Sequence, residues 1–152
     1  MNVLFVCTGN TCRSPMAQAM AAQHFAGAGI EALAASCGVH AWDGAPASFG
    51  AVGAMEAVGL DLAGHSAKSV TFELMEGADV VITMTAGHKA HLLAGFGEFA
   101  DKIHAMADLC AAAGDIGDPF GGDASLYAAC AADILRCIES IDWRGFYDCP
   151  GV

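Results

Sequence analysis

One short stretch near the start of the chain holds the residues best suited to chemistry. Cys7 and Arg13 are separated by five residues, and they follow an apolar stretch, Val3 to Val6, that predicts a buried strand. A cysteine sulfur can attack phosphorus, and the planar guanidinium of an arginine can hold two phosphate oxygens at once. This pattern therefore indicates covalent chemistry on a phosphate group.

The residues between the cysteine and the arginine favour a tight loop that binds an anion. Gly9 and Asn10 accept unusual backbone angles, so the loop can curl with successive N–H groups pointing inward, which binds phosphate without a metal. A following helix would add its positive N-terminal end. Ser14 can cap that helix while donating toward the sulfur of Cys7, and Pro15 suits its first position. We expect a thiolate to be favoured at Cys7.

This stretch has two other interpretations. A bare Cys-x5-Arg pattern is more often a buried core cysteine followed by a surface arginine. Here the preceding strand, the Gly and Asn within the loop and the Ser-Pro after it favour catalysis. A Walker-type nucleotide loop requires a Lys-Ser/Thr pair after its last glycine, and the chain has no such pair at that place.

The stretch from Val6 to Pro15 resembles the signature of the low-molecular-weight protein tyrosine phosphatase family, and most closely its bacterial branch of protein-arginine phosphatases. The family usually has a bulky aliphatic residue where this chain has Thr11, and threonine there marks the arginine-phosphatase branch. The likeness covers nearly the whole chain and is anchored again by Asp118-Pro119-Phe120-Gly121-Gly122. It implies a cysteine-dependent phosphatase with a phosphocysteine intermediate, no metal and no cofactor.

Asp118 is the expected proton donor. Pro119 keeps the backbone before it extended, and Phe120 supplies an apolar flank. Alternating strands and helices predict a parallel sheet, whose ligands bind at the carboxyl ends of the strands. The loop at Cys7 follows the first strand and the Asp118 loop follows the fourth, so both should lie at that edge. An isolated Asp-Pro is more often a solvated turn, but the partner motif and the resemblance favour the acid.

The resemblance also implies how the phosphate loop is held. The expected phosphate-binding residues are Thr8, Gly9, Asn10, Thr11, Cys12 and Arg13. In the family a serine, an asparagine and a histidine brace this loop, and by position they would be Ser36, Asn10 and His65, in addition to Ser14. Cys37 is a small departure from the family's Ser-Ala-Gly. Without the resemblance, His65 would be interpreted as a half-exposed turn histidine.

Thr11, Phe120 and Trp42 are expected to set specificity. Phosphoarginine presents polar N–H groups that lose water on binding, and the hydroxyl of Thr11 can offset this loss, whereas a phosphotyrosine ring suits an aliphatic wall. Trp42 falls where the family places one side of the cleft, although an edge-packing tryptophan fits its position equally well. Phosphoarginine in proteins is the predicted substrate, and phosphotyrosine is the alternative.

Two further functions and one regulatory role share the same loop. Arsenate reductases use two additional cysteines around the third strand, and residues 77–94 contain none, so this is a distant alternative. A redox-sensing or phosphate-binding module without turnover would not need the intact set of Cys7, Arg13 and Asp118. Cys12 is the expected redox partner of Cys7, because a neighbouring thiol can trap a sulfenic acid as a disulfide.

Composition sets outer bounds on the protein. The 152 residues, 55% of them hydrophobic, suit a single domain over residues 1–152. The net charge of −11 argues against nucleic acid or an anionic membrane as a partner. The apolar runs are too short for a membrane span, and a signal segment is not evident. Seven scattered cysteines suit a reducing compartment, so a cytoplasmic location is predicted. The oligomeric state is not predicted.

The predicted fold is a single α/β domain with a central four-stranded parallel sheet and helices on both faces. The expected strands are 2–6, 30–36, 78–84 and 102–106, and the expected helices are 14–26, 48–58, 72–76, one opening at 85, 106–113 and 123–142. His88 and His91 lie three apart, but without a nearby carboxylate or cysteine they do not predict a metal site. Cys130 and Cys137 are expected in the core. The tail 144–152 is not assigned to an element. Trp143, Phe146 and Tyr147 are expected to pack back on the sheet.

Overall fold

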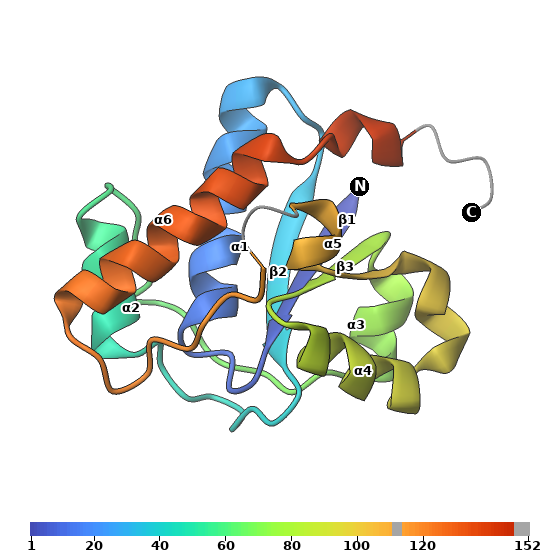
Figure 1. Ribbon diagram of the computed structural model, residues 1–152, viewed down its shortest axis with the longest axis horizontal. Coiled ribbons are helices and arrows are strands. Elements are labelled where there is room, and N and C mark those ends of the chain that lie inside the picture. The colour runs from blue at the N-terminus through green and yellow to red at the C-terminus, as the bar shows by residue number, and fades with distance from the viewer. Residues whose placement is uncertain (111–113, 148–152) are drawn as a thin grey trace.

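At the centre of the computed structural model, which describes residues 1–110 and 114–147, four parallel strands are arranged in the order β2-β1-β3-β4 (Figure 1). The strands are Asn2–Cys7 (β1), Leu33–Gly38 (β2), Val80–Thr83 (β3) and Ile103–Ala105 (β4). The helices are Arg13–Ala28 (α1), Phe49–Glu56 (α2), Phe72–Gly77 (α3), Ala86–Gly95 (α4), Met106–Leu109 (α5) and Ala124–Ser140 (α6), with short 3-10 helices at Gly97–Lys102 and Trp143–Phe146.

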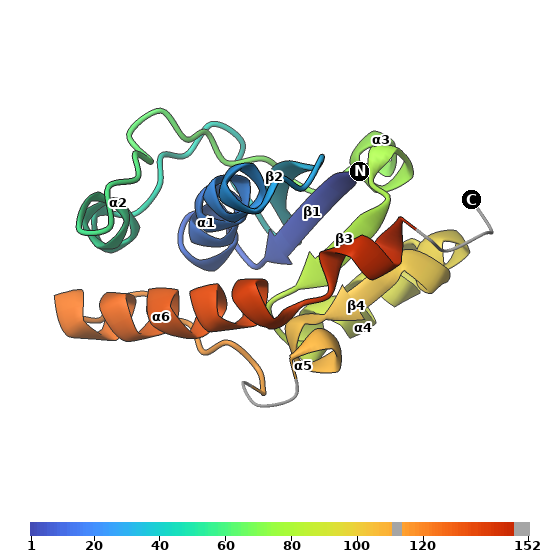
Figure 2. The same ribbon diagram turned by 90° about the horizontal axis from the view of Figure 1, so that it is seen from above.

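Side chains alternate across β1 and so contribute to two hydrophobic cores. Val3, Phe5 and Cys7 pack with buried residues of α1, α2, α5 and α6 on one face of the sheet. Leu4 and Val6 pack with buried residues of α3 and α4 on the other face. Figure 2 shows this separation of the helices. The predicted fold class, a parallel four-stranded sheet covered on both faces, is confirmed.

Several element ends differ from the prediction. The second strand begins at Leu33 rather than Ile30, because Gly29 ends α1 with a left-handed φ of 64° and the next residues connect the two elements. The first helix begins at Arg13, so Ser14 is not its cap and Pro15 is its third residue, still within the first turn. The helix after the fourth strand ends at Leu109, and residues 111–113 lie outside the described part.

The end of the described chain packs back on the body of the protein. Trp143 is buried, meets the ring of Phe25 edge-on at 4.9 Å and donates its indole N–H to the carbonyl of Ile138. Phe146 contacts the ring of His104 on β4. The expected packing against the sheet is therefore present for Phe146, whereas Trp143 packs against α1 and Tyr147 is exposed. Among the described helices, none has the length and apolar composition that a membrane span requires.

Candidate active site

The loop between β1 and α1 begins at Cys7 and returns to helical structure at Arg13. Within it Asn10 has a φ of 55°, the left-handed conformation that asparagine tolerates better than most residues. Gly9, for which the same freedom was predicted, has no positive φ. Within this loop Asn10 is therefore the residue that adopts the left-handed conformation, and its side chain is buried in the protein interior.

A polar network holds the buried Asn10. Its Nδ2 donates to the hydroxyls of Ser14 at 2.8 Å and Ser36 at 2.9 Å, and its Oδ1 accepts from the backbone N–H of Lys68 at 3.1 Å. The Nε2 of His65 lies 2.7 Å from the carbonyl oxygen of Asn10. The structure thus brings together the residues expected to brace the loop, and it links the loop to β2 and to the segment after α2.

Cys7 lies at the carboxyl end of β1 and is 2% exposed. Its sulfur is 2.9 Å from the hydroxyl of Ser14, which therefore faces the sulfur of Cys7 although it does not cap the helix. Cys37, the departure from the family pattern, is fully buried, and burial raises the pKa of its thiol to about 12. The Cys37 thiol therefore stays protonated and packs as an apolar residue.

Arg13 is 95% buried, and both terminal nitrogens of its guanidinium form hydrogen bonds. Nη1 donates to the carbonyl of Ile116 at 2.9 Å, and Nη2 donates to the hydroxyl of Thr8 at 3.4 Å. Nη2 also lies 3.6 Å from a carboxylate oxygen of Asp118. The buried Nε has no hydrogen-bond partner among the residues that the structure describes. A buried donor without a partner is unfavourable, so this N–H is a candidate contact for a bound anion.

The acid loop, residues 115–120, is anchored on the turn between β3 and α4. Asp115 accepts a hydrogen bond from the first N–H of α4 at Ala86, at 2.8 Å, and the N–H of Ile116 donates to the carbonyl of Met84 at 3.0 Å. Asp118 follows two residues later with its side chain half exposed. The two anchors place this carboxylate over Arg13.

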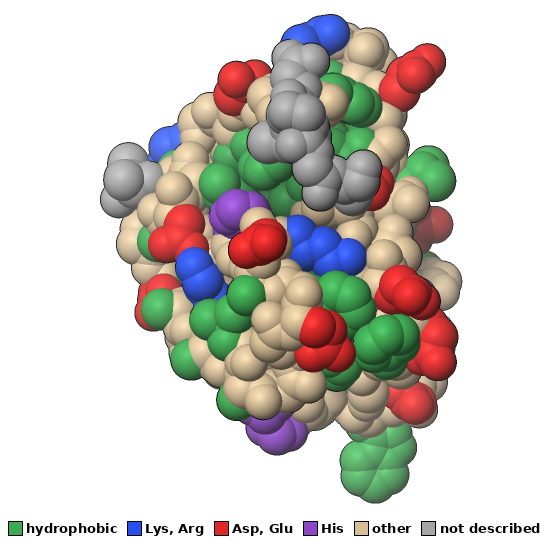
Figure 3. Space-filling view, turned by 90° about the vertical axis from the view of Figure 1, so that its right-hand side faces the viewer, with side chains coloured by type: hydrophobic (Ala, Val, Ile, Leu, Met, Phe, Trp, Pro, Cys, Tyr) green, Lys and Arg blue, Asp and Glu red, His purple; other side chains and the backbone are tan. Residues whose placement is uncertain are grey.

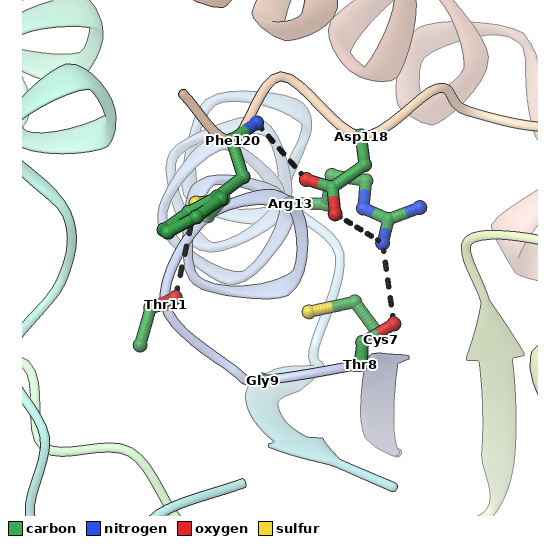
Figure 4. A pocket seen from close by; sticks show the side chains of 8 residues that line it. Cys7, Thr8, Gly9, Thr11, Arg13, Asp118 and Phe120 are labelled. Atoms are coloured by element: carbon green, nitrogen blue, oxygen red, sulfur yellow. Dashed lines mark hydrogen bonds and ion pairs between the residues drawn. The ribbon is translucent and has the colours of Figure 1, made fainter. Parts of the chain in front are cut away.

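These residues enclose one cavity of about 240 Å³ (Figure 4). Its lining residues are Cys7, Thr8, Gly9, Thr11, Cys12, Arg13, Asp118 and Phe120. The sulfur of Cys7 lies between the side chains of Thr11 and Phe120 on one side and those of Arg13 and Asp118 on the other. Trp42 does not line this cavity and is 84% exposed. Its expected role in the cleft stays a prediction.

Cys12 forms part of a second cluster behind the cavity. Its sulfur is 3.2 Å from the hydroxyl of Ser48 and 3.3 Å from that of Tyr127, and the two hydroxyls are 3.2 Å apart. Burial raises the pKa of Tyr127. Ser48 also caps α2 and donates its backbone N–H to the carbonyl of Thr11, so this cluster joins the phosphate loop to α2 and α6.

His88 is a site residue that the sequence analysis missed. Its spacing from His91 does not predict a metal site, but His88 is buried, and its Nε2 lies 2.8 Å from the hydroxyl of Thr8. Burial, and next the charge of Arg13, lower the pKa of His88 to about 4. The predicted order of strands could have indicated His88, because this residue follows the third strand and so lies at the same edge of the sheet as the phosphate loop. Among the described residues, no group of three or more His, Cys, Asp or Glu side chains could hold a metal ion.

Known proteins share this fold and much of this sequence. Residues 2–141 match the model of the low molecular weight phosphotyrosine protein phosphatase family. A protein-arginine-phosphatase of Bacillus subtilis is 39% identical over 128 residues, which cover 84% of this chain and 85% of that protein. The solved structure of a low molecular weight protein tyrosine phosphatase from T. tengcongensis is 40% identical, with a TM-score of 0.88 and coverage of 92% of this chain and 96% of that one.

A third relative carries a phosphoryl group at its active site. A mutant of the YwlE arginine phosphatase, solved with a phosphorylated active-site serine, is 35% identical, with a TM-score of 0.88 and coverage of 92% of both chains. The matched family spans nearly the whole of the present chain. The protein therefore belongs to the low molecular weight phosphotyrosine protein phosphatase family.

Proposed function

We propose that this protein is a cysteine-dependent phosphatase that removes phosphoryl groups from arginine residues of proteins. The observation that carries the proposal is one cavity in which Cys7, Arg13 and Asp118 converge beside Thr11. The similarity to the Bacillus subtilis protein-arginine-phosphatase supports the choice of substrate. The similarity to a tyrosine phosphatase at 40% identity keeps phosphotyrosine as the second candidate.

The geometry supports a two-step reaction. In the first step the Cys7 sulfur attacks phosphorus, the P–N bond breaks, and its electron pair stays on the guanidine nitrogen, which takes a proton from Asp118. Arg13 and the N–H groups of the loop stabilise the charge on the phosphoryl oxygens. In the second step Asp118 takes a proton from water, whose oxygen attacks the phosphocysteine. The S–P bond breaks, and the sulfur of Cys7 leaves as thiolate.

The buried Nε of Arg13 supports the proposal that the cavity binds a phosphoryl group. Because this N–H is buried and has no acceptor within the described part of the chain, a bound phosphoryl oxygen would satisfy it together with the neighbouring Nη2. The 3.6 Å contact between Arg13 and Asp118 is longer than a normal hydrogen bond, so it can yield to an entering substrate.

The direct test compares purified wild-type protein on matched peptides that carry either phosphoarginine or phosphotyrosine. We expect the larger kcat/KM on phosphoarginine, and no turnover of either peptide by Cys7→Ser with binding of inorganic phosphate retained. A larger kcat/KM on phosphotyrosine would select the second candidate. Absence of turnover on both peptides by wild type would overturn the phosphatase assignment.

Thr11 is the proposed determinant of the choice between these substrates. Its side chain lines the cavity across from Arg13 and Asp118 (Figure 4). Thr11→Ile removes the hydroxyl and adds apolar bulk, so we expect kcat/KM to fall on the phosphoarginine peptide and to hold or rise on the phosphotyrosine peptide. An unchanged ratio of the two values would remove Thr11 from this role.

We further propose that the substrates are phosphorylated proteins of the cytoplasm. Cell fractionation would test whether this protein is found in the cytoplasmic fraction.

A further inference from the structure

His88 makes contacts that the reaction as described does not use. It lies in the first turn of α4, and both ring nitrogens have hydroxyl partners: Nε2 lies 2.8 Å from the Thr8 hydroxyl and Nδ1 lies 3.0 Å from the Thr85 hydroxyl. Thr8 follows the nucleophile directly and lines the cavity. The imidazole therefore contacts a residue that lines the phosphate site, although the two residues are 80 positions apart in the chain.

The directions of these hydrogen bonds follow from which groups can donate. A guanidinium only donates, so the Thr8 oxygen accepts from Nη2 of Arg13. The Thr85 oxygen accepts from the backbone N–H of His88 as the helix cap. Its own proton is then available for Nδ1, which leaves the single N–H of a neutral imidazole at Nε2. Because the pKa of His88 is lowered to about 4, the ring is neutral at neutral pH.

We propose that His88 is a positioning residue, whose Nε2–H donates to the Thr8 oxygen so that the Thr8 hydroxyl proton is left to donate to a bound phosphoryl oxygen. In this arrangement the Thr8 oxygen accepts from both His88 and Arg13, which occupies its acceptor sites. Its remaining O–H is then free to donate, and Thr8 itself lines the cavity. His88 thereby adds a donor to the phosphate site without touching the ligand, and it holds Thr8 where it steadies the guanidinium of Arg13.

The inference rests on the proposed phosphoryl site at Cys7 but not on the identity of the substrate. The test therefore uses inorganic phosphate as the probe, with its Kd measured by calorimetry on the whole protein. His88→Asn keeps a polar group that can reach Thr85 but is too short to reach Thr8. His88→Gln places an amide N–H near the position of Nε2. Thr8→Val removes the hydroxyl at nearly constant volume.

We expect His88→Asn and Thr8→Val each to weaken phosphate binding by about tenfold, because each removes a hydrogen bond to a charged ligand. We expect His88→Gln to restore most of the affinity. When His88→Asn and Thr8→Val are combined, the loss of phosphate affinity should match that of Thr8→Val alone, because His88 acts only through Thr8. The kcat/KM on an activated aryl phosphate should follow the same order. His91→Ala, an exposed histidine one turn further along α4, is the control and should bind phosphate as wild type does.

A purely structural role for His88 gives a different pattern. The losses from His88→Asn and Thr8→Val would then add in the double variant, His88→Gln would not restore affinity, and the loss of affinity would follow a lowered Tm. That result, or wild-type affinity in His88→Asn, would overturn the proposal. Failure of the proposed function is distinguishable, because it would appear as an inactive wild type that still shows the same order of phosphate affinities.

Discussion

Asp118 carries the proton chemistry in the proposed reaction, and it is the half-exposed member of a pair whose other member, Arg13, is buried. We expect Asp118→Asn to lower kcat/KM by roughly 10²–10⁴-fold on phosphoarginine, whose nitrogen leaves only when protonated. An activated aryl phosphate, which needs little proton transfer, should lose much less. Steady-state kinetics on both substrates checks this, and equal losses would exclude Asp118 as the acid.

Cys12 lines the same cavity as Cys7 and is 5% exposed. If it resolves a sulfenic acid on Cys7, peroxide should inactivate wild type and a dithiol should restore activity, whereas Cys12→Ser should recover poorly because over-oxidation is not intercepted. Cys130→Ser is the matched control, since burial raises the pKa of Cys130 to about 11 and makes it unreactive. Recovery of Cys12→Ser equal to that of both other proteins would show that Cys12 is not the partner.

The lowered pKa of His88 predicts how the free energy of unfolding depends on pH. In the unfolded chain its pKa is near 6.5, but burial and then Arg13 lower the folded value to about 4. The unfolded state therefore binds the extra proton between these values, so the contribution of His88 to the free energy of unfolding is fully present above pH 6.5 and decreases as pH falls toward 4. The loss from this group is at most about 3 kcal/mol.

Urea unfolding of wild type and His88→Gln across this pH range measures the contribution. The variant should show a shallower decrease. Asp108 and Asp123, whose pKa values are lowered by hydrogen bonds, lose their contributions at lower pH in both proteins. Parallel curves for the two proteins would mean that His88 does not titrate as described.

The end of β2 illustrates how one element shapes another. A Cβ at Gly38 would lie 2.4 Å from the carbonyl oxygen of Thr8 and 2.9 Å from the backbone nitrogen of Asn10, so the strand and the phosphate loop are too close for any side chain. Gly38→Ala must displace the loop, and we expect a loss of about 10²-fold in kcat/KM, since an error of about 1 Å in position has such an effect.

The matched control for this substitution is Gly53→Ala in the middle of α2, where an added Cβ meets no atom within 4 Å. It should keep full activity and raise the free energy of unfolding by up to about 1 kcal/mol through helix propensity. Full activity in Gly38→Ala would show that the loop tolerates movement at this contact.

At the scale of the whole molecule, the net charge of −11 opposes the approach of an anionic substrate. On the face shown in Figure 3, acidic side chains are spread widely and basic ones are few. Raising ionic strength from about 0.01 M to 0.15 M shortens the screening length from about 30 Å to about 8 Å. We therefore expect kcat/KM to rise for a phosphoarginine peptide with acidic flanks and to fall for one with basic flanks. Equal responses of the two peptides would exclude long-range charge effects.

Much of this protein could be predicted from short stretches of its sequence. Cys7 and Arg13 were predicted from a local pattern, and Asp118 from the Asp-Pro-Phe stretch together with the partner motif and the resemblance to the phosphatase family. The alternation of strands and helices predicted the parallel sheet that the structure has. These features depend on residues close together in the chain, through backbone preferences, helix caps and hydrophobic periodicity. For the same reason Asn10 was recognised as a turn residue from its type and position alone.

The remaining parts of the site depend on contacts between distant residues. His88 reaches Thr8 across 80 positions, and Tyr127 reaches Cys12 across 115. The close approach of Gly38 to the loop likewise depends on how β2 pairs with β1. Such contacts follow from strand order and helix packing, which result from the burial of many apolar residues together rather than from any local pattern. The local motif thus predicts which residues react, whereas tertiary packing decided which distant residues contact them.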